Sequence, residues 1–249
     1  MIKFAIVGSG SKGNATLVFD EDSIFQIDMG ISLKRVESAL SEIKRKKSDL
    51  LGILFTHNHS DHISTLKYYH GRVETFSSEN TLECPDDILL PYQPFSLGSF
   101  TITPLKTSHD APNPVGFLVQ SGNEKLVYMT DTGFIPEESL PYMRGADYYI
   151  IESNHDYKML LHSSRPASLK HRIHSDFGHL SNSDSASYLA DLVSDKTKGI
   201  YLAHLSEECN TPELALASYE KIFKRHGLKP EEYGIICAKQ YECVFGGDK

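Results

Sequence analysis

Five short apolar segments of the chain each end in a polar turn that carries a histidine or an acidic residue. They cover residues 51–55, 100–105, 125–129, 148–151 and 199–203. Near-continuous apolar runs of this length are typical of strands that are buried on both faces of a sheet. If these strands end at one edge, their polar ends converge on a single site.

Three helices are predicted between these strands. Residues 32–47 place apolar side chains at the spacing of one helix face. Residues 183–193 follow a cluster of capping residues, and residues 211–226 begin at Thr-Pro-Glu, a typical helix start. The N-terminal third and residues 234–245 are predicted to form hairpins. This mixture predicts a layered α/β protein with sheets inside and helices outside, and no linker divides residues 1–249 into more than one domain.

The composition is that of a globular chain with an excess of acidic residues. Twenty-five Lys and Arg against 33 Asp and Glu leave a formal charge of −8 over 249 residues. This balance disfavours a protein that coats nucleic acid indiscriminately, because phosphate binding needs positive charge. The 12 histidines are more informative, since imidazole binds metals and transfers protons near neutral pH.

The cysteines and the apolar segments bear on the compartment of the protein. The four cysteines form no Cys-x-x-Cys pair and are predicted to be reduced thiols. The apolar run at the N-terminus is too short for a signal peptide, and no later segment approaches the length of a membrane span. We therefore expect a soluble, cytoplasmic protein that does not bind membranes.

A glycine-rich segment near the N-terminus imitates a nucleotide-binding motif. Residues 8–13 match Gly-x-Gly-x-x-Gly and Asp28 lies downstream, but a dinucleotide site requires a helix that opens at the third glycine. Residues 15–19 instead have the pattern of a second strand. Lys12 also lacks the Ser or Thr that follows the lysine of a P-loop. The segment is interpreted as a hairpin turn.

The strongest signal in the chain is the segment His57-Asn58-His59-Ser60-Asp61-His62. In an extended stretch, His57 and His59 project to the same side and can give two nitrogen ligands to one ion. Asp61 and His62 follow a turn of the chain and can face a second ion nearby. A core could not bury an unpaired aspartate beside three histidines, so the segment predicts metal binding.

Other strand ends can complete two metal sites. His109 can join the first pair of histidines, and His204 can join Asp61 and His62. Asp131 is suited to bridge, because a carboxylate has two oxygens and the two metals of such sites lie about 3.5–4 Å apart. The sequence thus predicts two divalent metal ions per chain, and the absence of a thiolate ligand leaves zinc and manganese both open.

This arrangement resembles the metallo-β-lactamase superfamily, in which H-x-H-x-D-H follows a strand and a histidine, an aspartate and a late histidine follow other strands. The resemblance implies a four-layer αββα sandwich with a dinuclear centre at the sheet edge. Residues 152–156, 169–173, 178–182 and 203–206 further resemble the YycJ/WalJ-like exonuclease branch of that superfamily. This implies a metal-dependent phosphodiesterase, in particular a 5′-to-3′ DNA exonuclease with a role in DNA repair.

The resemblance also points to a further catalytic histidine. His179 precedes a cluster of capping residues in a predicted turn, and the predicted ligand positions are filled without it. By similarity to related phosphodiesterases it would protonate the leaving oxygen or stabilise the scissile phosphate, and Asp61 is counted with it as catalytic. His70 and His226 are interpreted as surface or packing residues.

Residues 157–175 carry four cations and no acidic residue. A charge run is usually a solvated helix face, but this one joins two motifs near the predicted metal edge, which favours a phosphate-binding surface. DNA is the predicted partner, and the oligomeric state stays open. The residues predicted to contact substrate are Asn154, His155, Lys158, Arg165, Lys170, Arg172, Ser181 and Asn182.

Three alternatives are compatible with parts of this pattern. One is an RNA-processing endonuclease. Another is a hydrolase of thioesters, lactones or β-lactams, which would use the same metals on a carbonyl, although the basic segment argues against it. A regulatory module with a purely structural metal is disfavoured, because a structural site would be closed and this ligand set leaves a position for water.

Overall fold

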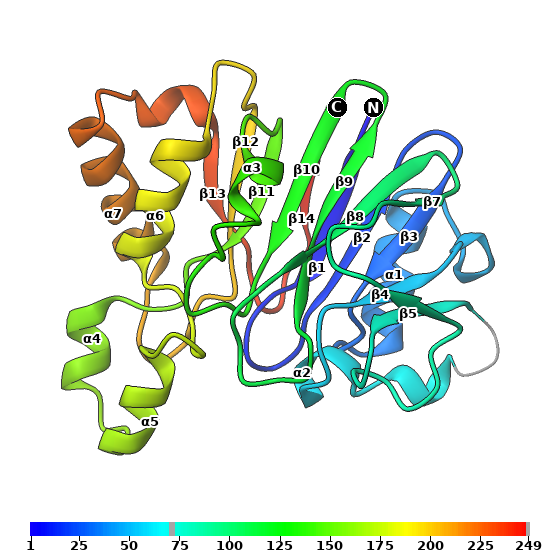
Figure 1. Cartoon of the computed structure of the whole chain (residues 1–249), viewed down its shortest axis with the longest axis horizontal. Helices are drawn as coiled ribbons and strands as arrows, with labels where there is room; N and C mark the ends of the chain where they lie inside the picture. The colour runs from blue at the N-terminus through cyan, green and yellow to red at the C-terminus, as the bar shows by residue number, and fades with distance from the viewer. Residues whose placement is uncertain (70–72, 248–249) are drawn as a thin grey trace.

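The computed structural model describes residues 1–69 and 73–247, which form two sheets packed face to face with helices on both outer faces (Figure 1). In the first sheet the strand order is β14-β1-β2-β3-β4-β5-β6. The bounds of its strands are β1 Lys3–Gly8, β2 Ala15–Phe19, β3 Ile24–Ile27, β4 Ile53–Phe55, β5 Thr75–Ser78, β6 Asp87–Leu89 and β14 Val244–Gly247.

The second sheet has the strand order β13-β12-β11-β10-β9-β8-β7. Within it β10, β11 and β12 are parallel to one another, whereas β8, β9 and β10 alternate in direction. The bounds of its strands are β7 Phe95–Leu97, β8 Phe100–Lys106, β9 Val115–Ser121, β10 Glu124–Met129, β11 Tyr148–Glu152, β12 Gly199–Ala203 and β13 Ile235–Cys237.

Helices cover the two outer faces of the sandwich. On the first sheet α1 buries Val36, Ala39 and Leu40, and on the second sheet α6 and α7 bury apolar side chains such as Leu189 and Phe223. The α-helices are α1 Leu33–Glu42, α2 Ser60–Ile63, α3 Leu140–Met143, α4 Tyr157–His162, α5 Ala167–Ile173, α6 Asn182–Leu192 and α7 Pro212–Arg225. Three 3₁₀ turns are η1 Lys47–Asp49, η2 Leu66–Tyr68 and η3 Pro230–Tyr233. The order of helix, sheet, sheet and helix confirms the αββα sandwich.

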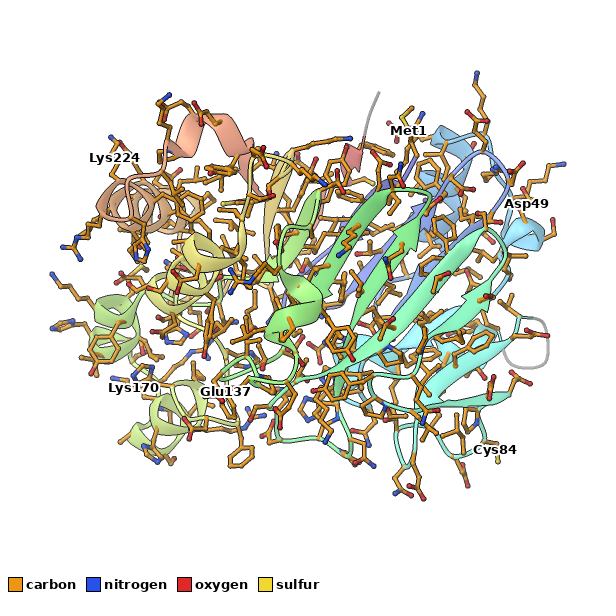
Figure 2. All side chains as sticks on the ribbon, turned by 45° about the horizontal axis from the view of Figure 1, so that its top comes forward. Met1, Asp49, Cys84, Glu137, Lys170 and Lys224 are labelled. Carbon is orange, nitrogen blue, oxygen red and sulfur yellow. The ribbon has the colours of Figure 1, made fainter. Side chains whose placement is uncertain are left out.

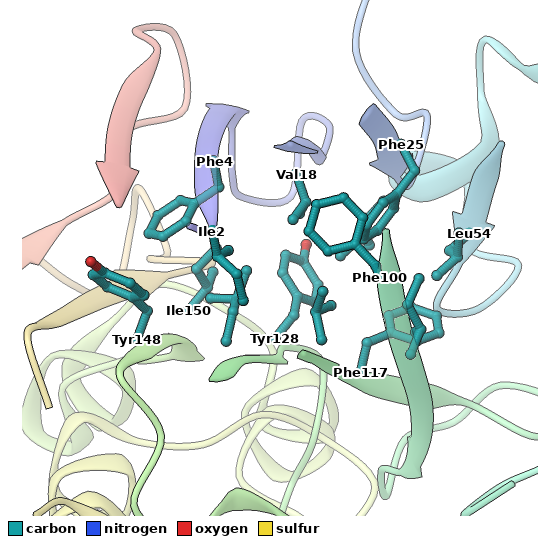
Figure 3. Close-up of a cluster of buried hydrophobic side chains, with 14 of the residues drawn as sticks. Ile2, Phe4, Val18, Phe25, Leu54, Phe100, Phe117, Tyr128, Tyr148 and Ile150 are labelled. Atoms are coloured by element: carbon teal, nitrogen blue, oxygen red, sulfur yellow. The ribbon is translucent and has the colours of Figure 1, made fainter. Parts of the chain in front are cut away.

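The main core lies between the two sheets, where side chains from both inner faces meet (Figure 3). Phe4 of the first sheet packs edge to face on Tyr148 and Tyr201 of the second, with ring centroids 5.7 and 4.7 Å apart. Phe25 and Phe100 make the same kind of contact across the interface at 5.2 Å. These aromatic contacts fix one sheet on the other, and with them the relative position of the strand ends.

Two predicted elements differ from the structure. The helix predicted over residues 32–47 ends at Glu42, because Lys44 adopts a left-handed conformation with a φ of 58° that the sequence pattern does not reveal. The hairpin predicted over residues 234–245 is wrong. Its two strands enter different sheets, β13 beside β12 and β14 beside β1, because each completes the edge of its own sheet.

The glycine-rich turn between β1 and β2 is a hairpin connection, as predicted, and not a nucleotide-binding loop. Gly13 has a φ of 137°, and a β-carbon there would lie 2.2 Å from the Gly30 carbonyl oxygen, so this close approach requires glycine. No helix within residues 1–69 and 73–247 is long and apolar enough to cross a membrane. His70 lies outside the described residues. His226 follows α7 at the surface, where its Nδ1 lies 3.5 Å from Asp191 Oδ1.

Candidate metal centre

Polar side chains from both sheets meet at one edge of the sandwich. The parallel strands β10, β11 and β12 end at this edge, and β8 runs in the same direction as β10 because both pair antiparallel with β9. In the first sheet, β4 ends just before His57, and α2 carries Asp61 and His62. The seven residues predicted to bind metal are thereby brought together: His57, His59, Asp61, His62, His109, Asp131 and His204.

The first group within this cluster consists of three histidines. One potential ligand atom from each of His57, His59 and His109 lies within 4.8 Å of the others. His59 Nδ1 is 3.3 Å from His109 Nε2, and His57 Nε2 is buried without a hydrogen-bond partner among the described residues. Three convergent imidazole nitrogens, one of them unpaired in the interior, form a donor set that fits a divalent cation.

The second group combines Asp61, His62 and His204. Asp61 Oδ2 lies 3.6 Å from both His62 Nε2 and His204 Nε2. In the part of the chain that the structure describes, His204 Nε2 is buried and has no hydrogen-bond partner. This set also fits a divalent cation, with one oxygen and two nitrogen donors.

Asp131 lies between the two groups. Its carboxylate oxygens are 3.3 Å from His62 Nε2, 3.5 Å from His204 Nε2 and 3.9 Å from His109 Nε2. Burial alone would raise the pKa of Asp131, but the charges of His204 and His62 hold that pKa well below the ordinary range of an aspartate. A carboxylate in this position faces both donor sets at once, as a bridging ligand would.

Two further acidic residues, which were not predicted to take part in the metal site, bind ring nitrogens of the histidines on the side away from the cluster. Asp28 Oδ2 lies 2.8 Å from His62 Nδ1, and Glu152 Oε1 lies 3.0 Å from His204 Nδ1. A carboxylate only accepts hydrogen bonds, so each Nδ1 carries a proton and Nε2 is the ring nitrogen that faces the cluster. The available signal was position, since Asp28 follows β3 and Glu152 ends β11 at the same edge.

Three residues of the centre have left-handed backbone conformations. The φ angles are 58° for Asp28, 54° for Asp131 and 54° for His204. Asp28 directly follows β3, His204 directly follows β12, and Asp131 comes two residues after the end of β10. The turn at each of these positions directs the side chain into the cluster. Strain of this kind is common at functional sites, where the surrounding structure enforces it.

His179 lies beside the cluster in the loop before α6. Its Nδ1 is 2.8 Å from Glu152 Oε1 and 3.7 Å from Asp131 Oδ1, and its side chain is partly exposed. Burial would raise the pKa of Glu152, but the charge and hydrogen bond of His179 and the bond from His204 lower that pKa to about 2. The ionised Glu152 fixes the ring of His179, and Nε2 is left as the nitrogen that can meet a substrate.

Four of the residues predicted to contact substrate are buried, and the side chains of three of them make hydrogen bonds within the protein. Asn154 Nδ2 donates to the His204 carbonyl at 2.8 Å, and Asn182 bonds Ser153 and Asn210. Ser181 caps α6, and its hydroxyl accepts from the Asp184 amide. His155 is fully buried, and its ring nitrogens have no hydrogen-bond partner in the described chain. The hydrogen bonds of Asn154, Ser181 and Asn182 thus hold neighbouring parts of the site, while contact with a substrate stays a prediction for all four residues.

Lys158 lies on α4, Lys170 and Arg172 lie on α5, and Arg165 lies in the segment that connects these two helices, which project together from one end of the molecule (Figure 1). Figure 2 shows Lys170 at the opposite end from Asp49 and Cys84. Arg165 pairs with Glu208 at 3.0 Å, and Arg172 pairs with Asp110 at 2.6 Å. Asp110 follows His109 in the chain, so the ion pair between Arg172 and Asp110 connects α5 to the segment that carries His109.

We expect the buried His155 to make the stability of the protein depend on pH. Burial lowers the pKa of His155 to about 4, while it is near 6.5 in the unfolded chain. Below pH 6.5 the unfolded state therefore binds a proton that the native state does not, and stability falls as the pH drops from 6.5 to 4. The loss amounts to about 3 kcal/mol.

Urea unfolding of the wild type and of His155→Leu at pH 7 and pH 4 measures this effect. The wild type should lose about 3 kcal/mol more than the variant over that interval, because all other titrating groups are common to both. Equal losses in the two proteins would contradict the assignment of a neutral, buried imidazole to position 155.

Comparison with known proteins shows similarity in sequence to one superfamily and to two bacterial enzymes. The family model for the β-lactamase superfamily domain matches residues 25–204. The chain is 34% identical over 240 residues to an exodeoxyribonuclease YycJ of Bacillus anthracis, covering 91% of each chain. It is 35% identical over 229 residues to an exodeoxyribonuclease WalJ of Streptococcus pneumoniae, covering 86% of this chain and 85% of the relative.

Among solved structures, the metallo-β-lactamase fold protein YhfI of Bacillus subtilis is similar over nearly the whole chain. The TM-score is 0.72 at 17% sequence identity, with 98% of this chain and 99% of that chain covered. At this identity the likeness concerns the fold alone.

Proposed function

The chain belongs to the β-lactamase superfamily, and we propose that this metal-dependent hydrolase is a nuclease that degrades DNA from the 5′ end and serves in DNA repair. The observation that carries the proposal is the cluster of five histidines and two aspartates, whose donor atoms form overlapping groups in which the atoms lie within 4.8 Å of one another. The curated relatives named exodeoxyribonucleases support the choice of substrate.

The donor set is suited to phosphoryl chemistry. Two divalent cations held there would polarise a phosphoryl oxygen and lower the pKa of water to near neutrality. With two ligand carboxylates, Asp61 and Asp131, the loaded centre would keep a charge of about +2, which favours an anionic phosphodiester over a neutral carbonyl. The number of ions, two, and their identity as zinc or manganese are parts of the proposal.

The protein's own groups supply the proton. Glu152 holds Nδ1 of His179, so that Nε2 is presented at the edge of the cluster where it can protonate a leaving oxygen. Asp28 and Glu152 orient the ligand histidines and exclude other rotamers of these rings. His179 is thus the catalytic residue of the proposal, and Glu152 is a positioning residue.

A direct assay tests the function. The metal-free protein should cleave 5′-labelled single-stranded or duplex DNA only after zinc or manganese is added, and products should begin at the 5′ end. Asp61→Ala should abolish cleavage, because it removes a ligand. Cleavage of RNA alone would favour the RNA-processing endonuclease. Hydrolysis of thioesters, lactones or β-lactams alone would favour a hydrolase that acts on carbonyl groups. If no nucleic acid is cleaved, the protein is not a nuclease.

The free cations of α4 and α5 should contribute to DNA affinity. Lys158 has no ion pair among the described residues, and Lys170 Nζ bonds only the Leu161 carbonyl at 2.7 Å, so both charges are available to phosphates. We expect Lys158→Ala to weaken binding to every sequence alike and to reduce the slope of log K against log salt by about 0.7 for single-stranded DNA.

Fluorescence anisotropy with a phosphorothioate oligonucleotide at several salt concentrations measures this slope. Lys221→Ala, on the exposed face of α7, is the matched control and should leave the slope unchanged. If Lys158→Ala and Lys170→Ala both behave like the control, the phosphate backbone does not cross these helices.

A further inference from the structure

A cavity of about 490 Å³ opens next to the metal centre and shares His179 with it. Its walls come from the loop after β10, which carries Phe134, from the loop after α5 with His174 and Asp176, and from α6 with Tyr188. Cavities of this size are typical of sites for small molecules or single nucleotides. A substrate phosphate at the centre would therefore have an adjoining space for the group attached to it.

The charge of the cavity excludes a second phosphate. Its lining includes Asp176, Asp184 and Asp191, and none of the described residues that line it is a lysine or an arginine. Asp184 is held in place by the Ser181 hydroxyl, 2.6 Å from its Oδ2. Carboxylates repel phosphate but accept hydrogen bonds from ring and exocyclic N–H groups, so the lining fits a neutral heterocycle with donor groups.

Phe134 supplies an aromatic face at this cavity. Its side chain is 39% exposed although it lies only three residues after the buried Asp131. The loop between them is fixed, since the Thr132 amide donates to Glu152 and the Thr132 hydroxyl donates to the Phe134 carbonyl. An exposed ring on a rigid loop beside a metal centre is suited to stack on a planar group.

Resting on the proposed nuclease function, we propose that this cavity receives an unpaired nucleobase, stacked on Phe134, from the 5′-terminal nucleotide, whose 3′ phosphate is the one at the metal centre. The base must leave its helical stack to enter, because the cavity lies to the side of His179 and accepts no phosphate. The substrate class is therefore a DNA end whose terminal nucleotide is single-stranded or frayed.

A double-mutant cycle between protein and substrate tests the proposal. One single-stranded oligonucleotide carries a normal 5′-terminal nucleotide, and the other carries an abasic tetrahydrofuran there. Wild-type kcat/KM should be about tenfold lower on the abasic end, and Phe134→Ala should lose about tenfold on the normal end but nothing on the abasic end. Tyr68→Ala, an exposed aromatic outside the cavity, is the control and should not change either value.

Equal kcat/KM of the wild type on both ends would overturn the proposal, as would an equal loss for Phe134→Ala on both. Either result leaves the nuclease function standing. If no DNA is cleaved at all, that function fails, and calorimetry then tests the cavity by itself. Deoxycytidine 3′-monophosphate should bind the metal-loaded wild type about tenfold more tightly than the 3-phosphate of the abasic tetrahydrofuran sugar. Phe134→Ala should abolish the difference, and equal binding of the two probes by the wild type would overturn the proposal.

Discussion

Replacing Asp131 by asparagine should lower kcat by at least about a thousandfold and reduce the bound metal from about two ions per chain to one or none. The reason is that the Asp131 carboxylate is the group that faces both sets of donor atoms. Asparagine tolerates the left-handed backbone at this position, so the fold should survive the change. Elemental analysis of the dialysed protein and the DNA assay measure the two effects.

The control for this experiment is Asp195→Asn, which removes an exposed carboxylate remote from the cluster. It should leave metal content and kcat unchanged. Near-UV circular dichroism and the melting temperature of both variants establish that they are folded. A folded Asp131→Asn that keeps two ions per chain would exclude the bridging role.

Replacing His179 by alanine should lower kcat by about 10²- to 10⁴-fold without loss of metal. His179 is bonded to Glu152 and lies 3.7 Å from Asp131, so the geometry alone would also permit it to be a metal ligand. The metal content separates the two roles, because a proton donor can be removed without releasing an ion. Loss of an ion in His179→Ala would therefore contradict the catalytic assignment.

Glu152→Gln tests the positioning of this histidine. The glutamine keeps the shape of the side chain but removes the charge that holds His179 and His204, so kcat should fall by about 10- to 100-fold and the pH profile should shift. His162→Ala, which changes an exposed histidine of α4, is the matched control. An unchanged pH profile in Glu152→Gln would indicate that the residue only supports the fold.

The sequence patterns alone were sufficient to predict a layered α/β protein with sheets inside and to select the residues that gather at one sheet edge, whereas the four-layer αββα sandwich followed from the resemblance to the metallo-β-lactamase superfamily. The reason is that buried strands are recognisable as apolar runs, and parallel strands bring the residues that follow them to one edge. Asp28 and Glu152 were not found as functional residues, because their role depends on which nitrogen of His62 and His204 they face. That information exists only in the folded arrangement.

Some polar residues near the site were predicted from the sequence to contact substrate, although the fold buries them. Asn154 and Asn182 have side chains that could bind phosphate, but the fold buries them and uses them to fix neighbouring loops. In the same way, two of the four cations of the basic segment are neutralised by Glu208 and Asp110, which come from distant parts of the chain. Residue type indicates what a side chain can bind, and burial decides what it does bind.

The pairing of β14 with β1 has a consequence for how the protein forms during synthesis. The first sheet contains β1, which comes early in the sequence, yet among the described residues the side of β1 away from β2 is paired by residues 244–247. Until these residues leave the ribosome, the backbone of β1 presents unpaired N–H and C=O groups to other chains. The nascent protein is therefore exposed to edge-to-edge association during the whole interval between the synthesis of β1 and that of β14, and the pairing of β14 ends that exposure.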